Sequence, residues 1–182
     1  YLPEAANSAG GWLAGVVPHR LPGGGLAPVR GLDARAMLES PRKAYVLLGV
    51  EPELDCWDGA AALKALQGAE LIVSLSPYAR LVGKSQAQII LPVATFAETS
   101  GTYVNAEGRW QSFQGASKPF GDARPAWKVL RVLGNLCGVA SFEYVSSEEV
   151  LAEVQSACGV VRLDNTLDFS QPLTPFQTDG LL

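Results

Sequence analysis

The sequence predicts an α/β fold: a Rossmann-like parallel sheet with flanking helices, a small β-hairpin and an extended C-terminal tail. Short apolar runs of strand length alternate with helical patterns between residues 44 and 91, which is typical of consecutive βαβ units. Two more strand patterns flank a turn between residues 102 and 113. With 182 residues, the chain has the length of one compact domain with a tail.

Residues 1–31 are predicted to form an N-terminal helix and a Gly/Pro-rich loop. The loop contains three consecutive glycines at 23–25. A phosphate-binding G-x-G-x-x-G motif is excluded because Pro28 stands where its third glycine should be, and no Lys-Ser/Thr follows as in a P-loop. We therefore interpret the glycines as a flexible loop.

Residues 32–160 are predicted to form the α/β domain. The run AYVLLGV at 44–50 is continuously apolar, which is typical of a parallel strand buried on both faces. Asp58 can cap a helix over 60–66, and Gly68 can end it. The other elements expected in this half are helices at 33–39 and 79–85 and strands at 70–76 and 88–91.

After Pro92 the pattern changes to a hairpin, with strands at 102–105 and 109–113. Asn105 and Gly108 lie in its turn, and both residue types suit left-handed backbone geometry. Two helices follow. Pro125 begins the first, which ends at Gly138, and Ser146 with Glu149 makes a capping box for the second.

Residues 161–182 are predicted to be an extended tail. Terminal disorder is one interpretation. Docking on the domain surface or on a partner subunit is the other, because the tail carries single apolar side chains at intervals. These are Leu167, Phe169, Leu173 and Phe176.

Composition and charge exclude several classes of function. With 14 Lys+Arg against 18 Asp+Glu, the net charge of −4 provides no basic face for nucleic acid. The longest apolar runs, 44–50 and 71–73, are far shorter than the roughly 20 residues that cross a bilayer, so no direct membrane insertion is expected. The chain begins at Tyr1 with no signal-peptide pattern, and we expect it to be a piece of a longer protein.

Cysteine and histidine are too sparse to predict a metal site. Cys56, Cys137 and Cys158 are too widely spaced for a C-x-x-C pair. Cys137 and Cys158 lie in apolar helical patterns, where a free cysteine packs as a small hydrophobe. The single histidine, His19, lies in a Pro-flanked loop without a second ligand nearby. We expect neither zinc nor an iron–sulfur cluster in this chain.

The most specific motif is LPVATFAETSGTYVNAEGRWQ at 91–111. A Leu-Pro pair ends a strand, because proline cannot donate to the sheet. Glu98 can then accept hydrogen bonds from the amides near Gly101 and Thr102, or pair with Arg109 across the hairpin. These polar residues are expected to hold a sharp corner of the chain.

This motif resembles a segment of molybdopterin oxidoreductases that reads as a strand ending in Leu-Pro, then E-x-x-G-T, then N-x-E-G-R-x-Q. In enzymes of that family the segment lies beside the pterin cofactor. The residues that carry the resemblance here are Glu98, Gly101, Thr102, Asn105, Glu107 and Arg109.

Two other places depart from the family pattern. The strand at 44–50 is followed by Glu51-Pro52, where the family usually has Gly-x-Asn-Pro. The stretch 79–88 lacks the usual Thr-Glu-Thr-Ala and Ala-Asp. A carboxylate at 51 would repel an anionic pterin phosphate. We therefore expect a vestigial corner with no catalytic residue, no metal and no cofactor in this chain.

Within the family, the chain is similar to the large iron–sulfur subunit (the G subunit) of NADH–quinone oxidoreductases. The similarity covers residues 1 to about 140, and PEAANSAGGWLAGVVP at 3–18 and GDARPAWKVL at 121–130 carry it together with 103–113. It implies a cofactor-free scaffold in a complex that passes electrons from NADH to quinone. The iron–sulfur clusters would lie in the N-terminal part of the parent subunit.

The same resemblance implies other peripheral-arm subunits as partners, and a peripheral location on the cytoplasmic face of the bacterial inner membrane. One alternative is the cofactor-binding domain of a true molybdopterin oxidoreductase of the formate dehydrogenase or nitrate reductase type. Another is a nucleotide-binding α/β domain that uses the carboxyl ends of its strands.

Overall fold

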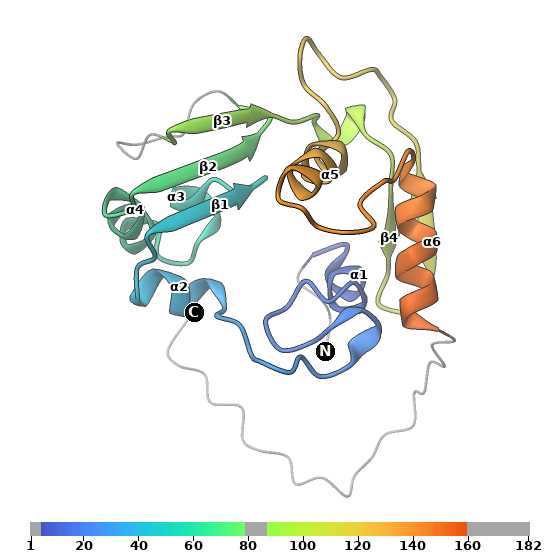
Figure 1. Ribbon diagram of the computed structural model, residues 1–182, viewed down its shortest axis with the longest axis horizontal. Helices are drawn as coiled ribbons and strands as arrows, with labels where there is room; N and C mark the ends of the chain where they lie inside the picture. Colours follow the sequence, from blue (N-terminus) through green and yellow to red (C-terminus); the bar gives the residue numbers. More distant parts are fainter. Residues whose placement is uncertain (1–4, 79–86, 160–182) are drawn as a thin grey trace, which may run out of the picture.

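The computed structural model describes residues 5–78 and 87–159 and has the predicted α/β architecture (Figure 1). Its sheet contains three parallel strands in the order β1-β2-β3, formed by Ala44–Leu48, Leu71–Ser76 and Ile89–Pro92. A separate antiparallel hairpin pairs β4 (Gly101–Val104) with β5 (Trp110–Phe113). The predicted helix at 79–85 and the tail at 161–182 lie outside the described residues.

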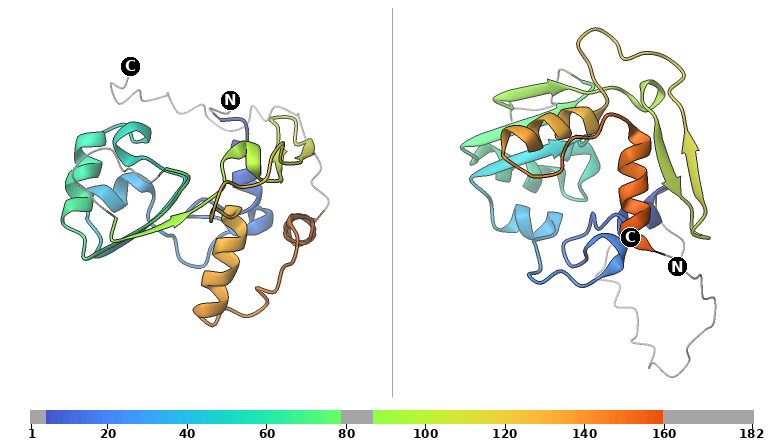
Figure 2. Two further views of the ribbon diagram at one scale, coloured as in Figure 1. Left: turned by 90° about the horizontal axis from the view of Figure 1, so that it is seen from above. Right: turned by 45° about the vertical axis from the view of Figure 1, so that its right-hand side comes forward.

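The helices fall into two groups. Figure 1 shows α3 and α4 behind the sheet and α2 below β1, while Figure 2 shows α1, the hairpin and α6 on the opposite side of the molecule with α5 between. The sequence did not predict α3 or the 3-10 turns η1 and η2, because three or four residues show no periodicity. The bounds are α1 Ser8–Leu13, η1 Pro22–Gly24, α2 Ala34–Glu39, α3 Pro52–Asp55, α4 Gly59–Gln67, η2 Phe96–Glu98, α5 Ala126–Leu136 and α6 Ser147–Cys158.

The core lies between the sheet and its helices. Tyr45 of β1, Leu66 of α4 and Ile72 of β2 form its centre and are all at least nine-tenths buried. The Tyr45 hydroxyl donates to the carbonyl of Met37 at 2.9 Å and accepts from the backbone amide of Arg42 at 2.9 Å. This buried hydroxyl is therefore satisfied, and it joins α2 to the sheet.

The prediction that the strand at 44–50 is buried on both faces is wrong. β1 forms the edge of the sheet, and Val46 and Leu48 are 65% and 46% exposed. Val46 lies in register with Val73 and, across β2, with Ile89, which is 45% exposed. In the described part of the chain this aliphatic face has no covering helix over β1. Parallel sheets normally have both faces covered, so the open face is suited to packing against further protein.

Local capping signals locate the helix starts. The Asp58 carboxylate accepts from the Ala61 amide at 2.8 Å at the start of α4, as predicted. The Ser146 hydroxyl accepts from the Glu149 amide at 3.2 Å at the start of α6. The Glu149 carboxylate returns to the amide of Val145 at 2.8 Å, one residue earlier than the capping box predicts.

The cysteines differ in their surroundings. Cys137 is exposed, so the prediction that it packs as a small hydrophobe is wrong: it follows the last turn of α5, outside the helix packing. Cys56 is half-buried, and burial and the nearby Asp55 raise the pKa of its thiol. Across 5–78 and 87–159, no helix is long and apolar enough to cross a membrane.

Candidate functional site

The corner at 91–111 follows directly from the end of the parallel sheet. Pro92 closes β3, and the chain then makes the η2 turn before it enters the hairpin. Glu98 accepts from the backbone amide and the hydroxyl of Thr95, each at 3.0 Å, and these bonds form a capping box. The prediction that Glu98 bonds the amides near Gly101 and Thr102 or pairs with Arg109 is wrong. The Thr95-x-x-Glu98 spacing was the local signal for this box.

The hydrogen bond from the Thr95 amide lowers the pKa of Glu98, with smaller contributions from the Thr95 hydroxyl and the Phe120 amide, and with desolvation opposing them. Glu98 stabilises the fold when it is ionised. Its contribution is therefore fully present above its unfolded-state pKa of about 4.3 and is lost as the pH falls through the lower folded-state value.

We expect Glu98→Gln to remove this part of the acid dependence of stability. The urea midpoint of the wild-type chain should exceed that of Glu98→Gln at about pH 6, and the gap should close as the pH falls below about 4. Urea titrations followed by circular dichroism at several pH values measure the gap. A gap that stays constant with pH would show that the Glu98 charge has no role in the corner.

The hairpin turn is held by one side chain. The Asn105 side-chain oxygen accepts from the amides of Glu107 at 3.0 Å and Arg109 at 2.9 Å. Gly108 has φ +74°, which favours glycine, as predicted. Asn105 does not share that geometry: among the described non-glycine residues only Ser141 has a positive φ. Asn105 therefore forms the turn through its side chain, and Glu107 and Arg109 are exposed beside it.

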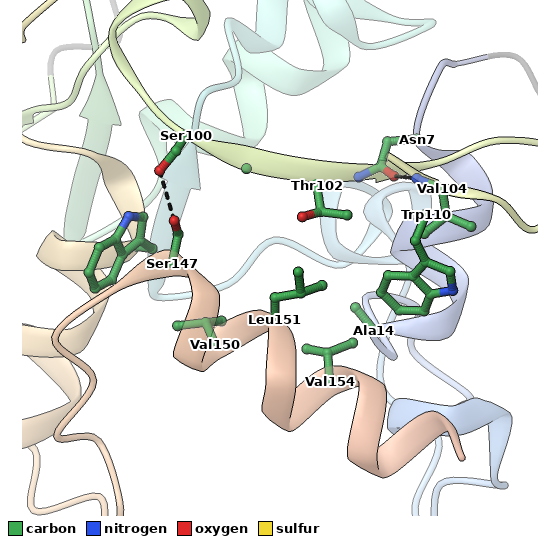
Figure 3. Close-up of a pocket in the computed structure, with 13 residues that line it drawn as sticks. Asn7, Ala14, Ser100, Thr102, Val104, Trp110, Ser147, Val150, Leu151 and Val154 are labelled. Carbon is green, nitrogen blue, oxygen red and sulfur yellow. Dashed lines mark hydrogen bonds between the residues drawn. The ribbon is translucent and has the colours of Figure 1, made fainter. Parts of the chain in front are cut away.

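The largest convergence of predicted residues is a cavity of about 260 Å³ between β4, α1 and α6 (Figure 3). It is lined by residues from all three segments that carry the family resemblance: Asn7 and Gly10, then Gly101 and Thr102, and then Trp127. Of the six corner residues, Gly101 and Thr102 line it; Glu98, Asn105, Glu107 and Arg109 lie outside its lining.

Two side-chain contacts close this cavity. The hydroxyls of Ser100 and Ser147 lie 2.8 Å apart and join the hairpin to α6, and the Asn7 oxygen accepts from the Val104 amide at 2.8 Å (Figure 3). A Cβ on Gly101 would lie 2.9 Å from the ring of Phe113, so the strand tolerates no side chain there. No carboxylate, imidazole, amine or thiol is among the described lining residues, so the cavity offers no acid–base pair.

The wall contributed by α6 was not predicted as part of a site. It consists of one helix face at i, i+3, i+4 and i+7 spacing. That spacing is visible in the sequence, but nothing local indicates that it meets the hairpin some fifty residues earlier. The residues are Ser147, Val150, Leu151 and Val154.

A second cleft, of about 450 Å³, lies at the carboxyl ends of β1 and β2, where open α/β sheets generally bind ligands. Gly49 follows β1 in this cleft, and Ser76 ends β2. Glu51 and Asp55 line the same cleft and bring two carboxylates to it. The predicted departure at Glu51-Pro52 is therefore part of this ligand-binding edge.

The residues of this cleft do not fit an anionic cofactor. Glu51 precedes the short helix α3, and its backbone amide, which an anion could have used, already donates to the Asp55 carboxylate at 2.6 Å. A phosphate about 4 Å from a carboxylate would be repelled by about 1 kcal/mol in water and about 4 kcal/mol near a protein surface. The cleft therefore disfavours a pterin phosphate.

Comparison with known proteins gives similarity to several classes of redox enzyme. The chain is 33% identical to the NADPH-Fe(3+) oxidoreductase subunit alpha of Geobacter sulfurreducens over 69% of this chain and 15% of that one. It is 30% identical to an NADH-quinone oxidoreductase large subunit (the G 2 subunit) of Rhizobium meliloti over 68% and 17%. It is 27% identical to the nitrate reductase of a Synechocystis strain over 84% and 25%. The chain thus spans about a quarter or less of these relatives.

The fold has a counterpart among solved structures. Acetylene hydratase from Pelobacter acetylenicus superposes on 85% of this chain and 23% of its own, with a TM-score of 0.56 and 20% sequence identity. The family model described as molybdopterin oxidoreductase matches residues 5–136, which is well over half of the chain and contains the whole corner motif. The chain therefore belongs to the molybdopterin oxidoreductase family.

Proposed function

We propose that this region is a cofactor-free scaffold within the large iron–sulfur subunit of an NADH–quinone oxidoreductase. The parent complex would pass electrons from NADH to quinone, with iron–sulfur clusters in the N-terminal part of the subunit. This region would contribute no catalytic residue. It would pack against other peripheral-arm subunits, at the cytoplasmic face of the bacterial inner membrane.

The observation that carries this proposal is the chemistry of the cleft at the strand ends. Glu51 and Asp55 give it negative charge, and the Asp55 carboxylate occupies the amide of Glu51. The similarity to the NADH-quinone oxidoreductase subunit of Rhizobium meliloti supports the choice of complex. The open aliphatic face of β1, with Val46 and Leu48, supports a packing role because exposed parallel sheet requires a cover.

Elemental analysis of the purified parent complex tests the proposal. We expect iron without stoichiometric molybdenum or tungsten, because no part of the cleft favours the anionic pterin that holds those metals. Calorimetric titration of the same preparation with a pterin-free ligand, inorganic pyrophosphate, should give no heat attributable to this cleft, and Glu51→Gln with Asp55→Asn should not impair electron transfer. Stoichiometric molybdenum or tungsten would contradict a cofactor-free scaffold.

The similarity to nitrate reductase, which covers 84% of this chain, favours one competing function: a cofactor-binding domain of a true molybdopterin enzyme. That function requires a cysteine, selenocysteine, serine or aspartate metal ligand elsewhere in the parent chain. The parent sequence and the metal content separate the two functions. A metal ligand together with stoichiometric molybdenum or tungsten would establish the competing one.

A further inference from the structure

An apolar groove of about 660 Å³ runs along α5, and the described part of the chain leaves it open. Leu136, Val145 and Val132 line it and are 80%, 71% and 46% exposed. Although α5 is strongly amphipathic in sequence, none of its residues is fully buried. An amphipathic helix whose apolar side faces a groove of this kind is suited to receiving another segment of protein.

The groove is also cationic. Arg124, Lys128 and Arg131 line it, and the ion pairs among the described residues are elsewhere, at Arg35–Glu39 and Lys43–Glu70. Arg131 donates through its guanidinium to the carbonyl of Tyr144 at 3.0 Å, but its Nε is buried without an acceptor within 5–78 and 87–159. A buried guanidinium N–H normally has an acceptor, so the groove favours an acidic occupant.

We propose that this groove binds residues 160–182 of the same chain. That segment has three aspartates, Asp164, Asp168 and Asp179, against one arginine, Arg162, so its charge is opposite to that of the groove. It also supplies the separate apolar side chains that a groove, rather than a flat surface, accommodates. These are Leu167, Phe169, Leu173 and Phe176.

The lengths are compatible with this arrangement. Tyr144 and Val145 line the groove just before α6 begins, whereas the segment follows the far end of α6 at Gly159. The 12 residues of α6 span about 18 Å, a distance that about six extended residues can cross. The segment can therefore reach the groove from about residue 166 onward, and its apolar residues begin there, at Leu167.

An exposed native cysteine allows a direct test in the full chain. Cys137 follows Leu136 of the groove and can carry a nitroxide label once Cys56→Ser and Cys158→Ser remove the other thiols. We expect the backbone amide signals of residues 166–178 to lose intensity in NMR spectra of the labelled protein. The signals should recover when ascorbate reduces the nitroxide.

A charge reversal provides the matched control. Lys128→Glu in the groove should abolish most of the intensity loss, whereas Lys118→Glu, an exposed change of equal charge outside the groove, should preserve it. Circular dichroism establishes that both variants are folded. Unchanged tail signals in the labelled parent, or equal loss in both variants, would overturn the proposal. So would loss seen only when labelled and isotope-enriched chains are different molecules, because a second copy would then occupy the groove.

Discussion

Leu75→Ala is expected to lower the free energy of unfolding by about 3 kcal/mol, within the range of about 2–5 kcal/mol found when buried leucines are truncated. Leu75 is 0% exposed in the central strand β2, where it lies in register with Leu48 of β1 and Leu91 of β3. The truncation leaves a cavity that flanking strands on both sides cannot close. Urea unfolding followed by circular dichroism measures the loss.

Leu48→Ala is the matched control for this prediction. It removes the same atoms from the register partner of Leu75, but Leu48 is 46% exposed on the edge strand. Because much of its side chain already contacts solvent, the loss should be well below that of Leu75→Ala, at about 1 kcal/mol. Equal losses at the two positions would mean that β1 is as well covered as β2.

The contrast between these two leucines shows what the sequence could and could not predict. AYVLLGV and ELIVSLS are both continuous apolar runs, and both were correctly predicted as neighbouring parallel strands. Which of them is central depends on where the third strand pairs. β3 pairs with β2, and this leaves Val46 and Leu48 at an open edge. No property of residues 44–50 alone encodes that choice.

The candidate site shows the same division between local and long-range information. The Thr95-Glu98 capping box and the Asn105 turn depend on residues at most four apart, and their spacing is visible in the sequence. The bond expected between Glu98 and Arg109 does not form, because the nearer box takes the carboxylate. The Ser100–Ser147 contact, by contrast, joins residues 47 apart and depends on where α6 packs.

Asn7→Ala is expected to lower the free energy of unfolding by about 2 kcal/mol, because it leaves a buried amide without a hydrogen-bond acceptor. Val104 is 2% exposed, and its amide lies on the side of β4 away from β5 and donates to the Asn7 oxygen (Figure 3). Asn7 is the N-cap residue of α1, yet its side chain makes no capping bond and is used for this contact instead. Gly10 makes room for it, since a Cβ there would lie 2.1 Å from the Asn7 oxygen.

Asn7→Asp separates the hydrogen bond from the loss of side-chain volume. It keeps an oxygen where the Val104 amide donates, so it should retain most of the stability that Asn7→Ala loses. Urea midpoints of the three chains at neutral pH give the comparison. Equal losses in both variants would assign the effect to the amide nitrogen of Asn7 or to the packing of α1. A loss confined to Asn7→Ala would establish that one side chain from the N-terminal segment holds α1 against the hairpin and so closes the cavity that the three family segments share.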